Sequence, residues 1–146
     1  MLKALANRGC ETCLIDLAAL PADALLARGQ APDVEEAIAT VGESRIVIAA
    51  TPTYRALYTG LLKSFFDLMP QAHLRGKICV GLQTGIAREH YLSLDYGLRP
   101  LFASLEGLPV GMLYATDDEF ANGSPSGAFV ERVEALAAEA IAMVSG

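Results

Sequence analysis

The stretch RIVIAATPTYRALYTGLLKSFFDLMP, residues Arg45–Pro70, decides the fold. Its first part, Ile46–Ala50, is a short apolar run typical of a buried strand. The run breaks at Thr51-Pro52 and passes into a loop that carries two tyrosines. A helix is expected next, from about residue 60 to 68, because apolar residues recur there at spacings of three and four: Leu61, Leu62, Phe65, Phe66 and Met69.

The alternation of strands and helices extends over the whole chain. Helices are expected at residues 2–8, closed by Gly9, at a segment capped by Asp33, at residues 89–105 and at the Ala/Glu-rich end. Further strands are expected at residues 13–17, 78–82 and 110–115. Such alternation implies right-handed crossovers and a parallel sheet covered on both faces. The sequence therefore predicts one domain over residues 1–146, a doubly wound, three-layer α/β fold.

Composition limits the classes of function. The chain has 146 residues, 53% of them hydrophobic, which is enough for a sizeable core. Its net charge of −6 argues against nucleic acid or an anionic membrane as partner. No charge-free stretch of about 18 residues and no export signal is present, so a cytoplasmic protein without a membrane span is expected. Three cysteines make a disulfide framework improbable.

Two loops are placed to bind a ligand. In a doubly wound sheet, ligands bind beyond the carboxyl ends of the strands. The loops at residues 51–60 and 83–88 follow two such ends. The first loop offers a wall for a flat ligand, because Pro52 fixes the backbone and Tyr54 can stack. From the pattern alone, an equally good interpretation is that Thr51-Pro52 only ends a strand and that the tyrosines are surface aromatics.

The helix expected at residues 89–105 contains Pro100, which removes a backbone donor and presses on the carbonyl of Tyr96. A helix usually absorbs this by a kink or a π-bulge, and π-bulges are frequent at functional sites. Tyr96 is expected away from the core stripe of this helix: Tyr91, Leu94, Leu98, Leu101 and Leu105. Tyr96 is therefore either an ordinary exposed aromatic or a functional one.

Four segments together resemble the NAD(P)H-dependent FMN reductases, a family with a flavodoxin-like fold. They are ATPTYRALYTGLLKSFFDLMP at 50–70, LRGK at 74–77, LQTG at 82–85 and HYLSLDYGLRPLFASL at 90–105. The resemblance is strongest to the reductases that supply reduced flavin to alkanesulfonate monooxygenase. It covers nearly the whole chain, and the ordered set of segments is specific where one alone would be weak.

The resemblance implies NAD(P)H-dependent reduction of FMN, with reduced flavin passed to a partner monooxygenase. It also implies a homo-oligomer, a dimer or tetramer, in which Tyr96 lies on a π-helix at a subunit interface. No metal is assigned. The residues that it places at the flavin are Thr51, Pro52, Thr53, Tyr54, Thr84 and Gly85, with Tyr58 and Gly60 as weaker neighbours.

The chain departs from the family at its beginning. Family members begin with a strand and a Ser/Arg-rich loop that holds the FMN phosphate at a helix N-terminus. Here Met1 falls inside the helix that follows this loop. The domain is thus expected to be incomplete at its N-terminus, without one central strand and the phosphate loop. The Thr59-Gly60 step is the only modest substitute for a phosphate site.

Two other functions stay open. One is a quinone, azo-dye or metal-ion reductase that keeps FMN bound throughout turnover. The other is a non-catalytic flavodoxin-like remnant. A hydrolase is improbable, because the chain has only two histidines, His73 and His90, and no G-x-S-x-G motif.

The remaining polar motifs are expected to be structural. His73 is expected on the surface, and His90 in solvent or at a subunit contact. The pair Cys10 and Cys13 has redox spacing but leads into an expected strand rather than a helix. Cys79 is expected in the core, and the acidic run at 117–119 is expected to be a solvated loop.

Overall fold

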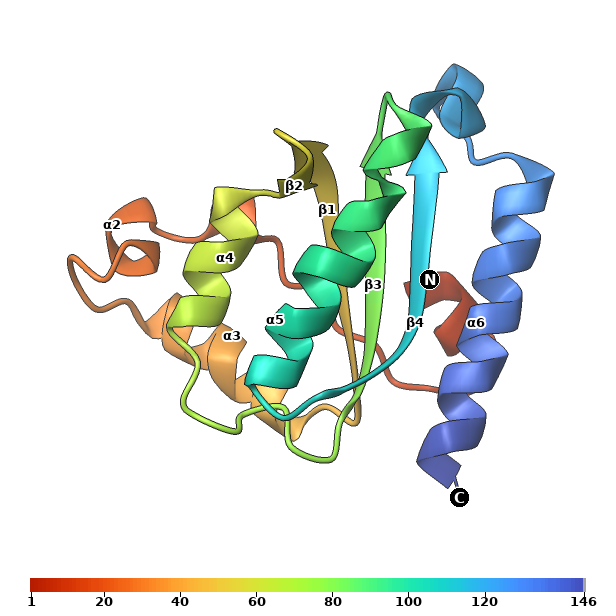
Figure 1. Ribbon diagram of the computed structural model, residues 1–146. Coiled ribbons are helices and arrows are strands. Elements are labelled where there is room, and N and C mark those ends of the chain that lie inside the picture. The colour runs from red at the N-terminus through yellow and green to blue at the C-terminus, as the bar shows by residue number, and fades with distance from the viewer. Residues whose placement is uncertain (146) are drawn as a thin grey trace.

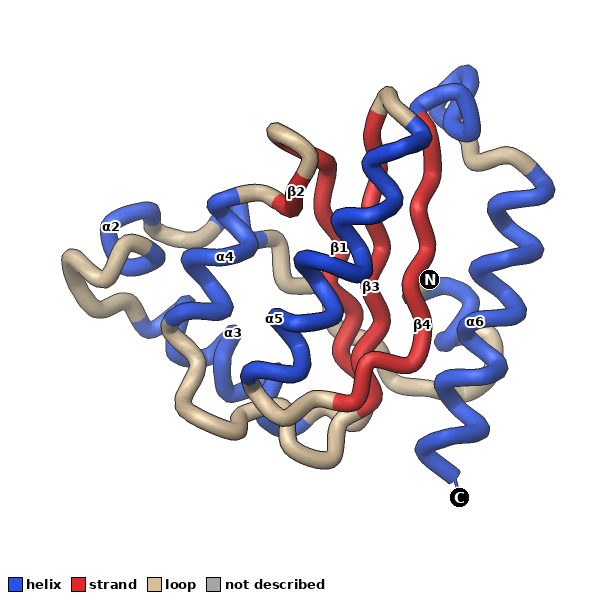
Figure 2. Tube along the Cα trace, in the orientation of Figure 1, coloured by secondary structure: helices blue, strands red, loops and turns tan. Residues whose placement is uncertain are grey.

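A four-stranded sheet lies between two layers of helices in the computed structural model, which describes residues 1–145 (Figures 1 and 2). β1, β3 and β4 pair in parallel, and β2 returns antiparallel along the end of β1. The doubly wound α/β fold is confirmed, but the sheet is mixed rather than wholly parallel. The strand order is β2 (Leu57–Tyr58), β1 (Ile46–Tyr54), β3 (Ile78–Gly85), β4 (Leu108–Thr116).

The larger helical layer lies on the left of the sheet in Figure 1 and contains the main core. Phe66 and Phe102 meet there with ring centroids 5.9 Å apart. This layer consists of α3 (Pro32–Glu43), α4 (Gly60–Asp67), the π-helical η3 (Leu94–Leu98) and α5 (Arg99–Ser104), with η1 (Leu17–Ala19) and α2 (Ala22–Leu25) at its edge.

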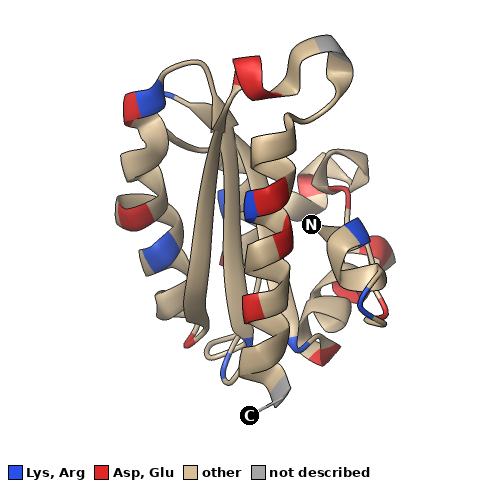
Figure 3. Cartoon of the chain, turned by 90° about the vertical axis from the view of Figure 1, so that its right-hand side faces the viewer, with Lys and Arg blue, Asp and Glu red and all other residues tan. Residues whose placement is uncertain are grey.

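The second layer is formed by α1 (Leu2–Ala6) and α6 (Gly127–Ser145), on the right of Figure 1. Ala4 and Leu5 pack there against Val133 and Ala137. Two short helices, η2 (Arg88–Tyr91) and η4 (Asp117–Gly123), lie at the carboxyl ends of the strands, at the top of the same view. Charged residues of both signs are scattered over the helices seen in Figure 3.

β1 has one edge, and the end of one face at Ala50 and Pro52, that the described residues leave uncovered. Val47, Ala49 and Thr51 point into the main core, whereas Ala50 and Pro52 on the opposite face are exposed. One edge of β1 pairs with β3 along the strand, and the other edge pairs only at its tip, with β2. Between residues 46 and 52 that second edge has no partner strand within residues 1–145.

β3 is the central strand of the parallel part and is more deeply buried. Cys79 and Val80 are completely inaccessible to solvent. Burial raises the pKa of the Cys79 thiol to about 12, because a thiolate would lose its hydration there. The expectation of Cys79 in the core is confirmed.

Three local expectations are wrong. Residues 13–16 form no strand, because no strand of the described chain lies beside them, and Asp16 begins η1 by accepting a hydrogen bond from the Ala18 amide. α3 is capped by Ala31 without a side-chain bond, and Asp33 lies in its first turn. All three longer strands extend past their expected ends, β1 to Tyr54 and β3 to Gly85.

The helix after β3 has the distortion that Pro100 predicts. A π-helical segment, residues 94–98, stands directly before α5, so the expected π-bulge is confirmed. Leu94, Leu98 and Leu101 are buried, as the core stripe predicts, but Tyr91 is 50% exposed because the helix starts as the short 3-10 turn η2. In α4 the stripe holds except at Leu61, which is 40% exposed.

Within the described residues, no helix is long and apolar enough to cross a membrane.

Candidate functional site

The loop expected after Ala50 is a β-hairpin. β1 continues through Thr51-Pro52 to Tyr54, turns at Arg55 and Ala56, and pairs back with Thr53 opposite Tyr58. Both turn residues have positive φ, 52° and 62°. This is the pattern of a type I′ turn, which fits the twist of a hairpin but strains residues that carry a Cβ. The hairpin therefore depends on contacts outside its own turn.

Thr51 and Thr59 fix the base of this hairpin. Thr51 is 6% exposed, and its Oγ1 accepts a hydrogen bond from the Thr59 amide at 3.2 Å. The two hydroxyl oxygens are 3.3 Å apart. The Thr59 hydroxyl also accepts from the Leu62 amide and so caps α4. Thr51 thus joins the end of β1 to the start of α4.

The two motifs predicted to form the ligand wall lie side by side. Pro52 of β1 is paired in register with Thr84 of β3. The next residue, Gly85, approaches Thr53 so closely that an added Cβ would lie 3.1 Å from the Thr53 Cβ. The side chain of Tyr54 is 66% exposed beyond them. The structure therefore brings five predicted residues, from Pro52–Tyr54 and Thr84–Gly85, to one edge of the sheet.

Tyr58 and Gly60 lie apart from this wall. Tyr58 is half-buried and packs on the π-helix, where an added Cβ at Gly97 would lie 3.2 Å from its ring. It supports the hairpin from below. Gly60 borders a different hollow of about 570 Å³, lined mainly by aliphatic residues of η1, α2 and α4. Their assignment to the flavin stays a prediction.

Two polar side chains near the wall, Gln83 and Tyr114, were not predicted from the sequence. Gln83 is 1% exposed, and its Nε2 donates to Thr53 Oγ1 at 2.9 Å. The Tyr114 hydroxyl donates to the Ala87 carbonyl at 2.9 Å and occupies the space that a Gly85 side chain would need. The only sequence signal for Gln83 is one amide side chain inside an apolar strand, and Tyr114 looks like any strand aromatic.

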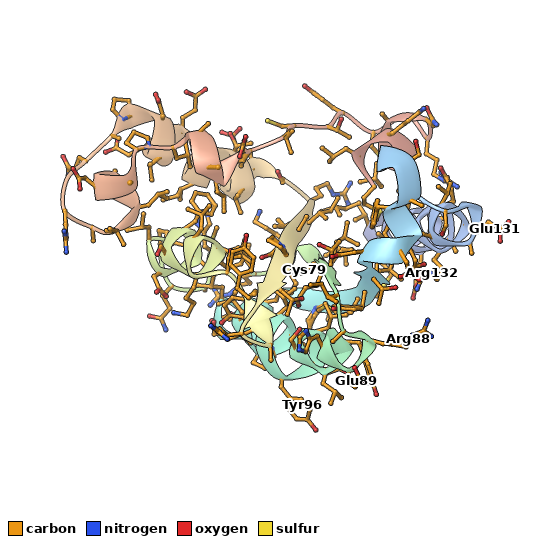
Figure 4. The ribbon with its side chains drawn as sticks, turned by 90° about the horizontal axis from the view of Figure 1, so that it is seen from above. Cys79, Arg88, Glu89, Tyr96, Glu131 and Arg132 are labelled. Atoms are coloured by element: carbon orange, nitrogen blue, oxygen red, sulfur yellow. The ribbon has the colours of Figure 1, made fainter. Side chains whose placement is uncertain are left out.

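Tyr96 points away from the molecule in Figure 4, which looks onto the carboxyl ends of the strands. It is 81% exposed in the middle of the π-helical segment. The next residue, Gly97, faces inward against Leu57, whose Cδ1 would lie 2.6 Å from an added Cβ. The π-helix thus packs on the hairpin through Gly97 and presents Tyr96 outward.

A second hollow lies where β3 and β4 end. It measures about 370 Å³ and is lined by Ile86, Arg88, Thr116, Asp117 and Asp118. Glu119, next to it, accepts from the Thr116 amide and pairs with Arg132, so the acidic run forms an ordered helical turn rather than a loop. Among the described residues, no group of three potential ligands could hold a metal ion.

The histidine and cysteine expectations have mixed outcomes. His73 is not a solvated surface residue, because its Nε2 lies 2.9 Å from the Ile38 carbonyl and its ring packs near Gly42 of α3. His90 is partly buried at η2. Cys10 is partly buried and Cys13 is exposed, so neither belongs to the buried core.

The site fits the ring of a flavin better than its phosphate. A planar ring needs flat backbone and aromatic surface, and the paired Pro52 and Thr84 with the exposed Tyr54 supply both. A phosphate needs free backbone N–H groups at a helix start. The candidate phosphate site at Thr59-Gly60 lies at the start of α4. There the hydroxyl of the N-cap Thr59 already accepts a hydrogen bond from the Leu62 amide. No better phosphate site is found within residues 1–145.

Sequence comparison relates the chain to a family of flavin reductases. A model of the family described as NADPH-dependent FMN reductase matches residues 1–138. An FMN reductase (NADPH) of Pseudomonas putida is 31% identical over 134 residues, which are 89% of this chain and 68% of that protein. The NADH-dependent FMN reductase SfnF of Pseudomonas fluorescens is 38% identical over 117 residues, 77% of this chain and 62% of that protein.

An FMN reductase (NADPH) of Escherichia coli is 37% identical over 86 residues, covering 59% of this chain and 45% of that protein. The chain therefore spans about half to two-thirds of the length of these relatives.

Solved structures agree. An NADH:FMN oxidoreductase in its apo form superposes with a TM-score of 0.84 at 29% identity, over 94% of this chain and 75% of that chain. An oxidoreductase from Corynebacterium diphtheriae superposes with a TM-score of 0.81 at 29% identity, over 99% of this chain and 82% of that chain.

The strain in the hairpin predicts that Ala56→Gly stabilises the protein. Glycine adopts positive φ without the steric cost that alanine carries, which outweighs the entropy that glycine loses on folding. We expect the free energy of unfolding to rise by about 0.5–1 kcal/mol in urea titrations. As a control, Ala103→Gly in the exposed part of α5 should lower it by about 1 kcal/mol. Equal losses in both variants would contradict a strained turn.

Proposed function

Because the chain belongs to the NADPH-dependent FMN reductase family, we propose that it acts in the NAD(P)H-dependent reduction of FMN. The observation that carries the proposal is the register of β1 and β3. It sets Pro52 beside Thr84 and puts the side-chain-free Gly85 next to the hairpin. These residues form one flat wall at the carboxyl edge of the sheet, where doubly wound folds bind their ligands.

The chemistry of hydride transfer is supplied by the nicotinamide and the flavin when both are bound. The protein's part is to hold the flavin ring flat and oriented. In this proposal Tyr54 stacks on the ring, while Thr53, Thr84 and Gly85 border it with backbone and short side chains. No acid-base pair is needed, which agrees with a wall in which the described residues place no histidine or carboxylate.

We also propose that the reduced flavin leaves the protein and serves a partner monooxygenase in the cytoplasm. The wall is open: Tyr54 and Pro52 are exposed, and no described segment covers them. An open site of this kind suits a flavin that is bound and released in each cycle better than one held permanently. In steady-state kinetics the rate should then saturate with added free FMN, which a reductase with permanently bound FMN would not require.

The test of the ring wall is Tyr54→Ala. We expect FMN binding, followed by fluorescence titration, to weaken about tenfold, because the stacking of one aromatic side chain is lost. The circular dichroism spectrum should stay native, since Tyr54 is exposed and contributes little to the core. Tyr54→Phe should keep the affinity. Leu108→Ala, at a half-exposed apolar residue at the opposite end of the sheet, serves as control. Unchanged affinity in Tyr54→Ala would remove Tyr54 from the site.

We infer further that the uncovered edge of β1 receives another strand. Between residues 46 and 52 this edge has no partner strand in the described chain, and Ala50 on the same strand is exposed. Strands of parallel sheets are ordinarily buried on both faces. The length of the relatives leaves room for such a strand, and a loop after it would supply the phosphate site that the described residues lack.

A version extended upstream by about 20–25 residues, enough for one strand, a loop and a helical turn, tests this inference. We expect it to bind FMN more tightly and to melt at a higher temperature than the 146-residue chain, because both the edge and the phosphate gain partners. A Gly/Ser extension of equal length should change neither quantity. An equal affinity for FMN and an equal melting temperature of the 146-residue chain and the extended version would mean that the phosphate is bound elsewhere.

We propose that Tyr96 lies at an interface between copies of this chain in a homo-oligomer. Its ring is 81% exposed at the centre of a π-helical segment, and π-helical segments are frequent at functional sites. Deleting Tyr96 should return the segment to α-helical phase and shift the protein to smaller species in sedimentation velocity. Deleting a residue from the exposed turn at Gly29 is the control. A wild-type protein that sediments as a monomer would contradict the interface.

A further inference from the structure

Among the described residues, one buried side-chain atom without a hydrogen-bond partner belongs to Gln83, which lies beside the proposed ring wall. Gln83 is 1% exposed on the central strand β3, and its Nε2 donates to Thr53 Oγ1 at 2.9 Å. Its Oε1 is buried and has no hydrogen-bond partner in the described part of the chain. A buried amide oxygen without a partner destabilises a fold, and such exceptions ask for an explanation.

Packing holds the Gln83 amide against Thr53. Residues 81 and 85 are glycines on the same face of β3, two positions before and after Gln83. The Met112 sulfur fills the space beside Gly81, and the Tyr114 hydroxyl fills the space beside Gly85, at 2.4 Å and 2.5 Å from the positions of added Cβ atoms. Gln83 is thus enclosed along the strand.

This contact decides what the Thr53 hydroxyl can do. Its oxygen accepts the hydrogen bond from Gln83, so its own proton is free to be donated elsewhere. Thr53 is half-buried, and its side chain lies on the same face of β1 as Thr51, opposite Pro52 and Tyr54. Its hydroxyl is next to Gly85, 3.1 Å from the position of an added Cβ, and offers a donor at the ends of β1 and β3, where the edge of a flat ligand on the wall would lie.

We propose that Gln83 is a positioning residue for the flavin: it orients the Thr53 hydroxyl as a hydrogen-bond donor to an acceptor atom of the ring. This inference rests on the proposed function. In this proposal the fold tolerates the destabilising, unpaired amide oxygen of Gln83 because the same side chain serves ligand binding. Buried polar atoms without partners are expected mainly at functional sites. Gln83 does not touch the ligand itself.

The decisive variant is Gln83→Met, which keeps the size of the side chain and removes both polar atoms. If Gln83 only positions Thr53, the melting temperature should stay equal or rise, because an unsatisfied polar atom leaves the core. The Kd for FMN and for riboflavin, which shares the ring but has no phosphate, should rise about tenfold, the loss of one hydrogen bond. Leu82→Met, on the opposite face of β3, should change neither Kd.

Thr53→Val and the double variant complete the test. Thr53→Val should weaken both flavins as much as Gln83→Met does, Thr53→Ser should keep the affinity, and the double variant should be no weaker than either single one. An additive, roughly hundredfold loss in the double variant would overturn the inference, as would unchanged affinity in Gln83→Met. A lowered melting temperature with unchanged affinity would make Gln83 purely structural. A wild-type chain that binds neither flavin would instead refute the proposed function, and this inference with it.

Discussion

The parallel pairing of β1 with β3 is the constraint on which the rest of the site depends. Seven successive residue pairs, from Ile46 opposite Ile78 to Pro52 opposite Thr84, fix the register. A slip by one residue would turn Thr51 and Gln83 to the other face and separate Thr53 from its amide partner. The apolar residues of both strands prevent such a slip, because Val47, Ala49 and Cys79 must all face the main core. Ordinary core packing thus sets the geometry of the polar edge.

Glycines convert this register into contacts between elements. Gly85 lets Thr53 and the Tyr114 hydroxyl approach the same point, which joins the ends of three strands. Gly97 lets Leu57 and Tyr58 of the hairpin rest on the π-helix. A side chain at either position would push the hairpin outward. The turn of this hairpin is already strained. The hairpin is therefore held by its neighbours, and the π-helix becomes part of the support of the candidate site.

Much of this architecture could be predicted from the sequence. The order of strands and helices follows from apolar periodicity, and the distortion near Tyr96 follows from Pro100. The ends of strands and helices were predicted wrongly where tertiary contacts determine them. β1 runs through Thr51-Pro52 because the strand edge that meets β3 keeps its register there, and a proline inside a paired strand is rarely expected.

Other features depend on contact partners that the sequence does not reveal. Residues 13–16 have the composition of a strand, but a strand exists only where a partner supplies hydrogen bonds, and the described chain supplies none. His73 binds the Ile38 carbonyl 35 positions away, and the Gln83 amide reaches Thr53 over 30 positions. Such contacts arise from the crossing of elements, so their polar character is visible in the sequence while their partners are not.

Two features of the described chain lack hydrogen-bond partners, and both lie at the candidate site. The open edge of β1 and the orphan oxygen of Gln83 both cost stability, and both lie on the strands that form the candidate site. They differ in what can relieve them: an edge needs a continuous backbone partner, whereas one enclosed amide oxygen needs a single donor. The edge can therefore be completed by polypeptide alone. A strand added at the free edge of β1 would not lie beside Gln83, which is buried on the central strand β3 between two glycines whose side-chain space is filled by Met112 and Tyr114.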